Sequence, residues 1–275
     1  MSEDFFLKVW GARGSRQVSD ASVQRYGGDT TCFEVRLGDY SLVIDCGSGA
    51  MALENDLLER GVRDLDLLLT HSHLDHVIGL PFFCLCYMDR TELRIHVGHM
   101  DRDVRGDRPF QALFNPLLFP VPVKLLKALS IKRFHPPLTK TFGPLEVAAT
   151  RLNHPGGSVG YRISHKGRSV AIITDHEHGD PDIDATLIEF CAGADLMIID
   201  AMYTEDEYAK RVGWGHSTPQ EAIKLARAAD VPNILLSHHA PYRTDEALDE
   251  QVAELQKDFP NLQAAAAGGL YRIGA

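Results

Sequence analysis

Four side chains that readily bind metal ions occur within six residues, at positions 71–76 (His-Ser-His-Leu-Asp-His). The segment directly follows an apolar run that is typical of a buried strand. In an extended chain alternate side chains point the same way, so His71 and His73 can hold one cation. After the chain turns, Asp75 and His76 can hold a second. Imidazole and carboxylate donors without a thiolate suit Zn²⁺, and also Mn²⁺ or Fe²⁺.

Three more metal-capable side chains stand singly after apolar runs, namely His154, Asp175 and His238. A carboxylate such as Asp175 can bridge two cations roughly 3.5–4 Å apart, the spacing at which a shared hydroxide becomes a nucleophile. His154 would then complete the first metal site, and His238 would complete the second. His239 is the alternative to His238, which we favour because it comes directly after the strand. The alternatives to a catalytic centre are a polar surface turn and a non-catalytic, metal-dependent sensor.

The elements that must position these ligands are short apolar runs that alternate with helical patterns, which predicts an α/β fold with more than one sheet. Helices are expected from Thr218, where a capping box is followed by a proline at the first helical position, and from Thr244. The expected strands are residues 5–9, 32–37, 41–45, 67–70, 93–97, 145–150, 159–164, 169–174, 196–199 and 234–237.

Residues 101–140 differ in composition from the rest of the chain, because six prolines alternate with phenylalanines and leucines there. We interpret this segment as an apolar, proline-rich insertion within one hydrolase domain that spans residues 1–275. Such an insertion could form a lid or wall at the site, or it could bury an interface between subunits. The sequence leaves both possibilities open.

The overall charge restricts the partners of the protein. The 275 residues include 28 basic and 38 acidic ones, a net charge of −10. We therefore do not expect a long nucleic acid as partner, because such binding needs a basic face. A small anion that reaches a metal is compatible with this charge. No window approaches the roughly 18 apolar residues of a membrane span, and the acidic start differs from a secretory signal, so we expect a cytoplasmic protein without membrane contact.

The chain resembles the metallo-β-lactamase fold hydrolases, through the residue 71–76 motif together with His154, Asp175 and His238. The resemblance is strongest to the branch that contains ribonuclease Z and small phosphodiesterases. Three motifs mark that branch, at residues 27–32 (Gly-Gly-Asp-Thr-Thr-Cys), 153–155 (Asn-His-Pro) and 215–218 (Gly-His-Ser-Thr). Glyoxalase-type thioesterases share the ligands but lack the last motif. The resemblance implies a four-layer αβ/βα sandwich with the metals between the sheet edges, and a homodimer.

The resemblance also implies roles for residues around the metals. Asp45 corresponds to the family's buried carboxylate behind the metal-binding histidines, although it could simply form a turn before Gly47. His216 corresponds to the acid that protonates the leaving group, and Asp200 to the carboxylate that orients it. Asp75 is expected to act both as a ligand and in catalysis.

We therefore predict a dinuclear hydrolase that uses two divalent metal ions, Zn²⁺ before Mn²⁺ or Fe²⁺, with a metal-bridging hydroxide and His216 as general acid. The expected substrate is a small phosphodiester such as a cyclic nucleotide, because His154 and Asp175 are only 21 residues apart and leave no room there for the long substrate arm of ribonuclease Z. Arg13 or Arg16, in a glycine-rich segment, could contact the substrate. The alternative is a hydrolase of carboxylic esters, lactones or thioesters.

Overall fold

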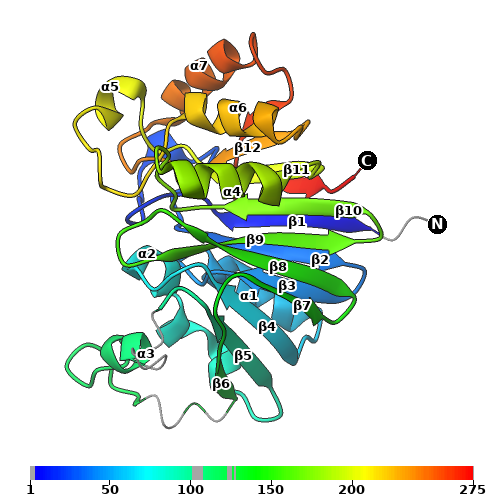
Figure 1. The fold of residues 1–275 in the computed structure, drawn as a ribbon. Coiled ribbons are helices and arrows are strands. Elements are labelled where there is room, and N and C mark those ends of the chain that lie inside the picture. The colour runs from blue at the N-terminus through cyan, green and yellow to red at the C-terminus, as the bar shows by residue number, and fades with distance from the viewer. Residues whose placement is uncertain (1–3, 101–107, 123–125, 127, 275) are drawn as a thin grey trace.

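Two seven-stranded sheets pack face to face in the computed structural model, which describes residues 4–100, 108–122, 126 and 128–274 (Figure 1). The first sheet has the order β14-β1-β2-β3-β4-β5-β6 and the second β13-β12-β11-β10-β9-β8-β7. The strands of the first sheet are β1 (Phe5–Gly11), β2 (Cys32–Leu37), β3 (Tyr40–Ile44), β4 (Asp64–Leu69), β5 (Glu92–Val97), β6 (Leu129–Arg133) and β14 (Leu270–Arg272). Those of the second are β7 (Leu138–Phe142), β8 (Leu145–Leu152), β9 (Ser158–His165), β10 (Arg168–Ile173), β11 (Leu196–Asp200), β12 (Ile234–Ser237) and β13 (Leu262–Ala264).

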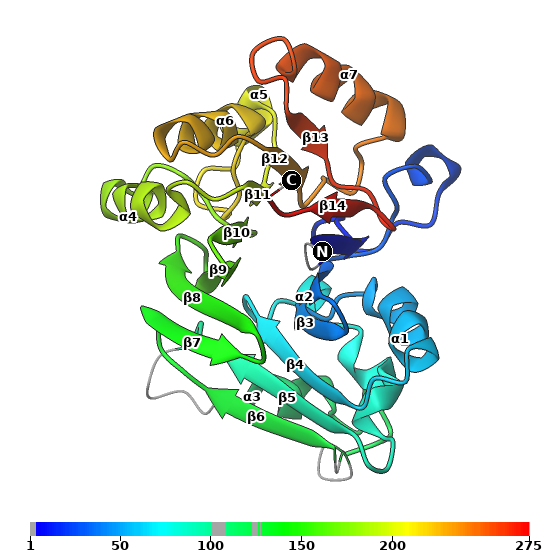
Figure 2. The same cartoon turned by 90° about the vertical axis from the view of Figure 1, so that its right-hand side faces the viewer.

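Helices cover the outer faces of both sheets, with α1 beside the first sheet and α4, α6 and α7 beside the second (Figure 2). The helices are α1 (Ala50–Glu59), α2 (Leu74–Val77), α3 (Arg108–Leu113), α4 (Pro181–Cys191), α5 (Glu205–Tyr208), α6 (Pro219–Ala228) and α7 (Asp245–Leu255). Short 3₁₀ turns span Ala21–Val23, Leu80–Phe82 and Cys84–Cys86. None of the helices in the described ranges is both long and apolar enough to cross a membrane.

Three main apolar clusters fill the spaces between these layers. One lies between the sheets and includes Leu7 and Val35 from the first and Ile163 and Ile172 from the second, all fully buried. A second cluster packs α1 against the first sheet, and a third packs α4 and α6 against the second. The order of layers is therefore helix, sheet, sheet, helix, which confirms the predicted αβ/βα sandwich. Burial of apolar surface between layers is the main driving force for such a fold.

Local sequence signals explain the elements that carry the site. Strands β2 and β12 have the predicted bounds, and their residues are largely buried on both faces, as in sheets covered by helices. Helix α6 begins as predicted, because the Thr218 side chain accepts a hydrogen bond from the backbone N–H of Glu221 at 3.3 Å. Strands β10, β11 and β12 run parallel, with Asp200 paired to Ser237. Their carboxyl ends therefore meet at one edge, where ligands of such sheets bind.

The proline-rich segment has more regular structure than the sequence indicated. Part of it, residues 101–107, 123–125 and 127, lies outside the described residues. In the remainder, α3 is followed by β6 and by the start of β7, which are the edge strands of the two sheets. Leu129 and Ile131 alternate with polar residues in β6 and pack on the cluster of the first sheet. The final third of the predicted insertion is therefore largely part of the sandwich.

Candidate metal centre

The first group of metal-capable side chains combines His71 and His73, in the loop after β4, with His154, in the loop after β8. The ring centroid of His71 lies 4.5 Å from that of His73 and 4.7 Å from that of His154. His73 Nδ1 and His154 Nε2 are 3.1 Å apart. One nitrogen of each ring lies within 4.8 Å of the other two, so the three side chains converge on one point.

The second group combines Asp75 and His76, in the short helix α2, with His238, directly after β12. Asp75 Oδ2 lies 3.5 Å from His76 Nε2 and 3.6 Å from His238 Nε2. The same oxygen accepts a hydrogen bond from the backbone N–H of Ser15 at 2.8 Å. The glycine-rich segment thus orients Asp75 through its backbone.

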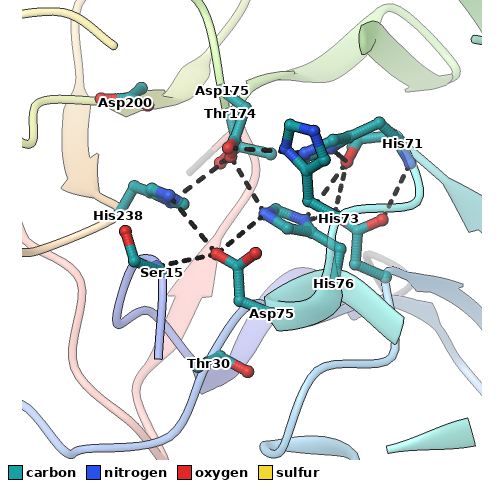
Figure 3. Close-up of polar contacts among 12 residues, drawn as sticks. Ser15, Thr30, His71, His73, Asp75, His76, Thr174, Asp175, Asp200 and His238 are labelled. Atoms are coloured by element: carbon teal, nitrogen blue, oxygen red, sulfur yellow. Dashed lines mark hydrogen bonds and ion pairs between the residues drawn. The ribbon is translucent and has the colours of Figure 1, made fainter. Parts of the chain in front are cut away.

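Asp175, after β10, lies between the two groups and presents one carboxylate oxygen to each (Figure 3). Its Oδ1 is 3.1 Å from His76 Nε2 and 3.3 Å from His238 Nδ1. Its Oδ2 is 3.7 Å from His71 Nε2 and 3.8 Å from His154 Nε2. This division of the two oxygens is the arrangement of a carboxylate that bridges two cations.

The donor set fits two divalent metal ions. Four buried ring nitrogens make no hydrogen bond within the described residues: His71 Nε2, His76 Nε2 and both nitrogens of His238. A buried polar atom without a partner costs roughly 1–3 kcal/mol, so a fold does not keep four such atoms together without a use for them. Imidazole and carboxylate donors that converge in this way are the ligands of Zn²⁺ and related metals.

The pKa shifts of the side chains in the centre reflect the charge that is buried there. Burial lowers the pKa of His71 well below its ordinary value, which favours the neutral imidazole that binds metals. Burial opposes the charged form of Asp175, but His238, His76 and His71 outweigh it and hold the pKa of that carboxyl well below its usual range. Burial likewise lowers the pKa of His76, yet nearby carboxylates, Asp175 first, raise it well above the ordinary value. The excess of buried negative charge is a condition that a cation relieves.

Asp45 is buried directly behind the metal centre, next to β3. Its Oδ2 accepts hydrogen bonds from His76 Nδ1 and from the Thr70 hydroxyl, both at 2.7 Å. Its Oδ1 accepts one from the Thr70 backbone N–H at 2.8 Å. Asp45 therefore holds His76 in the tautomer that presents Nε2 to the metal centre.

His216 and Asp200 form a second pair at the other side of the centre. His216 Nδ1 donates to Asp200 Oδ2 at 2.7 Å, and Asp200 Oδ1 accepts from the backbone N–H groups of Met202 and Ser217. The His216 ring stacks on that of His238, with centroids 4.7 Å apart. Burial lowers the pKa of His216, but the charge and hydrogen bond of Asp200 outweigh burial and raise the pKa to about 9. His216 can therefore carry a proton beside the metal centre.

Arg13 is buried, and its guanidinium donates to the carbonyl oxygens of Gly27, Ala240 and Arg243 at 2.9–3.2 Å. These hydrogen bonds use the guanidinium of Arg13 that the sequence predicts as a substrate contact. Arg13 instead connects the loops that contain these carbonyl groups. Arg16, by contrast, is exposed in a cleft beside Asp75.

His239 faces away from the centre, and its Nε2 donates to the Ala265 carbonyl at 2.9 Å. Of the two neighbouring histidines, His238 is the one that approaches the carboxylates of Asp75 and Asp175.

Glu177 has a structural role that sequence reasoning missed. Its buried carboxylate accepts hydrogen bonds from the backbone N–H groups of Gly213 and Gly215, at 2.6 and 2.7 Å, and from the Tyr208 hydroxyl at 3.1 Å. The carbonyl of Gly215 in turn accepts from His154 Nδ1 at 2.8 Å. Glu177 thus fixes the loop that orients His154 and leads into His216. Its place two residues after Asp175 was the only sequence signal.

Four residues around the centre have left-handed backbone conformations, which are rare without glycine. They are Ser15, Asp45, Asp175 and His238, with φ between 55° and 61°. Each such residue costs of order 1 kcal/mol and persists because surrounding contacts enforce it. This clustering is typical of functional sites and explains how strand ends direct these side chains toward one point.

Two clefts adjoin the centre on either side of Leu74. The apolar cleft, of about 610 Å³, is lined by His71 and His73 and by residues of the α3 region. The Ser15 cleft, of about 720 Å³, is lined by Asp75, by residues 15–17 and by part of α1. Both are within the range of small-molecule sites.

Comparisons with known proteins agree with this geometry. A family model described as a beta-lactamase superfamily domain matches residues 40–239. The chain is 27% identical over 273 aligned residues to a ribonuclease Z of Bradyrhizobium diazoefficiens, covering 82% of this chain and 87% of that protein.

Two solved structures have similar folds. The crystal structure of the metallo-beta-lactamase fold protein YhfI from Bacillus subtilis matches with a TM-score of 0.75 and 22% identity, over 98% of this chain and 100% of that one. A diphosphatase from the PhnP family matches with a TM-score of 0.73 and 17% identity, over 98% and 96% of the two chains.

Proposed function

Because the chain belongs to the beta-lactamase superfamily, in its ribonuclease Z-like branch, and carries the His and Asp clusters of a metal-dependent hydrolase, we propose that it hydrolyses a small phosphodiester with two bound divalent metal ions. A cyclic nucleotide is one member of this substrate class. The observation that carries the proposal is the His216–Asp200 pair beside the bridging carboxylate of Asp175. A phosphodiester with an alkoxide leaving group needs such a proton donor, whereas an activated ester does not.

The ligands divide into two sets that share Asp175. His71, His73 and His154 would hold one metal ion, and the second group around His76 would hold the other. When bound, the two ions would activate a water for attack and neutralise charge that develops on the phosphoryl oxygens. The predominance of imidazole in both sets supports Zn²⁺ as the native metal, with Mn²⁺ or Fe²⁺ as alternatives.

The protein side chains supply the proton that the leaving group needs. Asp200 fixes the His216 ring through Nδ1, so Nε2 is the nitrogen that can meet the substrate. A protonated His216 would donate from Nε2 to the departing oxygen, while Asp200 keeps the ring oriented. Asp45 performs the corresponding orienting task for His76 without contact with the substrate.

A compact substrate is supported by the chain between His154 and Asp175. Residues 158–165 and 168–173 form the paired strands β9 and β10 there, joined by a two-residue turn. These strands belong to the sandwich, so this span forms no projecting substrate arm. The acidic overall charge of −10 agrees with a small substrate rather than a long polyanion.

The test is the initial rate on bis-p-nitrophenyl phosphate beside a panel of small lactones. The protein is stripped of metal and reloaded separately with Zn²⁺ or Mn²⁺, with Asp175→Ala as the control. We expect metal-restored phosphodiester cleavage that Asp175→Ala abolishes, with circular dichroism to verify that the variant is folded. An intact diester together with an opened lactone would replace the proposal by a carboxylic-ester hydrolase and would withdraw the proton-donor role of His216.

A further inference from the structure

The two clefts beside the metal centre meet at one residue and differ in the polar side chains that line them. Leu74, 61% exposed, lies within the ligand segment and lines both clefts. His71 and His73 line the apolar cleft, whereas Asp75 lines the Ser15 cleft. The reacting phosphorus of a bound diester would therefore lie between them, with one ester arm directed into each cleft.

Apolar side chains make up most of the apolar cleft beyond the histidines. They come from α2, from the loop after β5, and from α3 and the residues that follow it: Val77, Met100, Pro109, Ala112, Leu113 and Leu118. Leu118 is 79% exposed, although a leucine side chain normally gains from leaving water. An exposed apolar surface that continues into a reaction centre is typical of a site for an apolar ligand.

Few polar groups interrupt this surface. The His99 ring lies within hydrogen-bond distance of the Ser72 hydroxyl, with Nε2 and Oγ 3.1 Å apart, whereas its Nδ1 has no hydrogen-bond partner within the described residues. Arg108 is the one arginine or lysine among the described lining residues, and no aspartate or glutamate is among them. A cleft whose described lining residues carry no carboxylate can accept an apolar group beside an anionic phosphate.

The Ser15 cleft offers a different surface. Its lining combines apolar side chains, including Met51, Ile78 and Phe82, with a larger set of hydrogen-bonding ones than the apolar cleft has, among them Ser15, Arg16, Gln17, Asp29, Ser48 and Asn55. Such groups can bind a hydroxylated or otherwise polar arm, since each buried polar contact then finds a partner. The two sides of the centre are thus suited to unlike groups.

From this contrast we propose that the substrate is a linear phosphodiester with one apolar arm, an alkyl chain, which lies in the apolar cleft, and one more polar arm, which lies in the Ser15 cleft. The inference rests on the proposed phosphodiesterase function and narrows its substrate class. It favours an amphiphilic diester over a cyclic nucleotide, which has no separate apolar arm to fill the first cleft.

A series of alkyl p-nitrophenyl phosphates with methyl, butyl and octyl arms tests the inference on the metal-loaded enzyme. Each methylene that leaves water should raise kcat/KM about threefold to fourfold, so the butyl ester should exceed the methyl ester by at least about tenfold. A flat dependence on chain length, with clear turnover of the methyl ester, would overturn the inference and leave the proposed function intact. Absence of metal-dependent turnover on every ester would overturn the proposed function and the inference with it.

Two exposed alanines allow a matched pair of variants. Ala112 lies on α3 in the apolar cleft, and Ala52 lies on α1 in the Ser15 cleft. Ala112→Trp should remove the preference for octyl over methyl, because the added ring fills the space for the chain. Ala52→Trp should retain the chain-length preference. A preference lost in Ala52→Trp and kept in Ala112→Trp would contradict the assignment of the apolar arm.

Binding gives a readout that does not depend on turnover. Isothermal titration with octylphosphonate should show a larger negative heat-capacity change than with methylphosphonate, because more apolar surface leaves water. Ala112→Trp should reduce this difference and Ala52→Trp should not. Equal heat-capacity changes for the two phosphonates in the wild-type protein would count against the inference.

Discussion

Two histidine–carboxylate pairs of the same geometry stand on opposite sides of the metal centre, one from each half of the chain. His76 Nδ1 donates to Asp45 at 2.7 Å, and His216 Nδ1 donates to Asp200 at 2.7 Å. Both aspartates are fully buried, and they stand at the carboxyl ends of β3 and β11. In each pair the carboxylate fixes the orientation and tautomer of the ring.

The pairs differ in the surroundings of the second ring nitrogen. His76 Nε2 lies 3.1 Å from Asp175 and 3.5 Å from Asp75, inside the metal centre. The His216 side chain retains 11% exposure and stacks on His238 at the edge of the centre. The same two-residue unit can thus serve a metal ligand or a proton donor, and the position of Nε2 decides between the two roles.

The largest effect should come from removal of the proton donor. His216→Ala should lower kcat on a diester with an alkoxide leaving group by about 10²–10⁴-fold, because general acid catalysis contributes that much. The loss on a p-nitrophenolate leaving group should stay below about tenfold, since that group needs little protonation. Parallel rate measurements and metal analysis check this, with the metal content expected to be unchanged. Equal losses on both substrates would remove the distinction between the two pairs.

Disruption of the His76–Asp45 pair should change the affinity of the protein for metal. Asp45→Asn should weaken metal binding about 10–100-fold, because the orienting carboxylate of a metal-bound histidine is lost. Excess metal should restore most of the turnover. Competition with a chromophoric chelator measures the affinity, and Asp200→Asn is the matched control whose affinity should change little. A similar weakening in both variants would mean that the two pairs act alike.

Metal removal should lower the free energy of unfolding more in the wild-type protein than in Asp45→Asn. At a metal concentration of 100 Kd, each bound ion stabilises the native state by about 2.7 kcal/mol, so a chelator that removes both should lower the free energy of unfolding by about 5.4 kcal/mol. In Asp45→Asn at the same concentration, a tenfold weaker Kd at the site that contains His76 should reduce this chelator effect to about 4.1 kcal/mol. Urea unfolding of each protein with and without chelator provides the comparison. An equal chelator effect in both proteins would contradict the role of Asp45.

The smallest effect should be a change in the pH profile. Asp200 raises the pKa of His216 against the opposing effect of burial, so Asp200→Asn should lower that pKa. His216 must be protonated to donate, and the alkaline decline of kcat should therefore begin at lower pH in the variant than in wild type. Near neutral pH the loss of kcat in Asp200→Asn should stay below about tenfold. A uniform loss at every pH would indicate a purely structural role for Asp200.

The sequence was most informative where chemistry is local. Residues 71–76 bring four metal-capable side chains together in one short segment, and His154, Asp175 and His238 each follow an apolar run that became a strand. A capping signal located the start of α6, and apolar residues at helical spacing after Thr244 located α7. Such patterns act over a few residues, so they are visible without the fold.

Residues whose roles depend on distant partners could not be interpreted from the sequence. Arg13 bonds to three carbonyls, two of them more than 220 residues away, and a glycine-rich context gives no sign of them. Glu177 acts through a loop more than 30 residues later. Strand β6 was hidden by the surrounding prolines, and α4 was missed although Asp180 caps it and Pro181 begins it.

We propose that two metal ions held around Asp175 support phosphodiester hydrolysis. The most direct measurement is a titration of metal-free protein with Mn²⁺, in which bound metal and the rate on bis-p-nitrophenyl phosphate are followed in the same samples. We expect the rate to rise to a plateau at two bound ions per chain. Asp175→Ala should neither bind two ions nor reach this rate. Full turnover in the presence of excess chelator, or an undiminished rate in Asp175→Ala, would contradict this proposal.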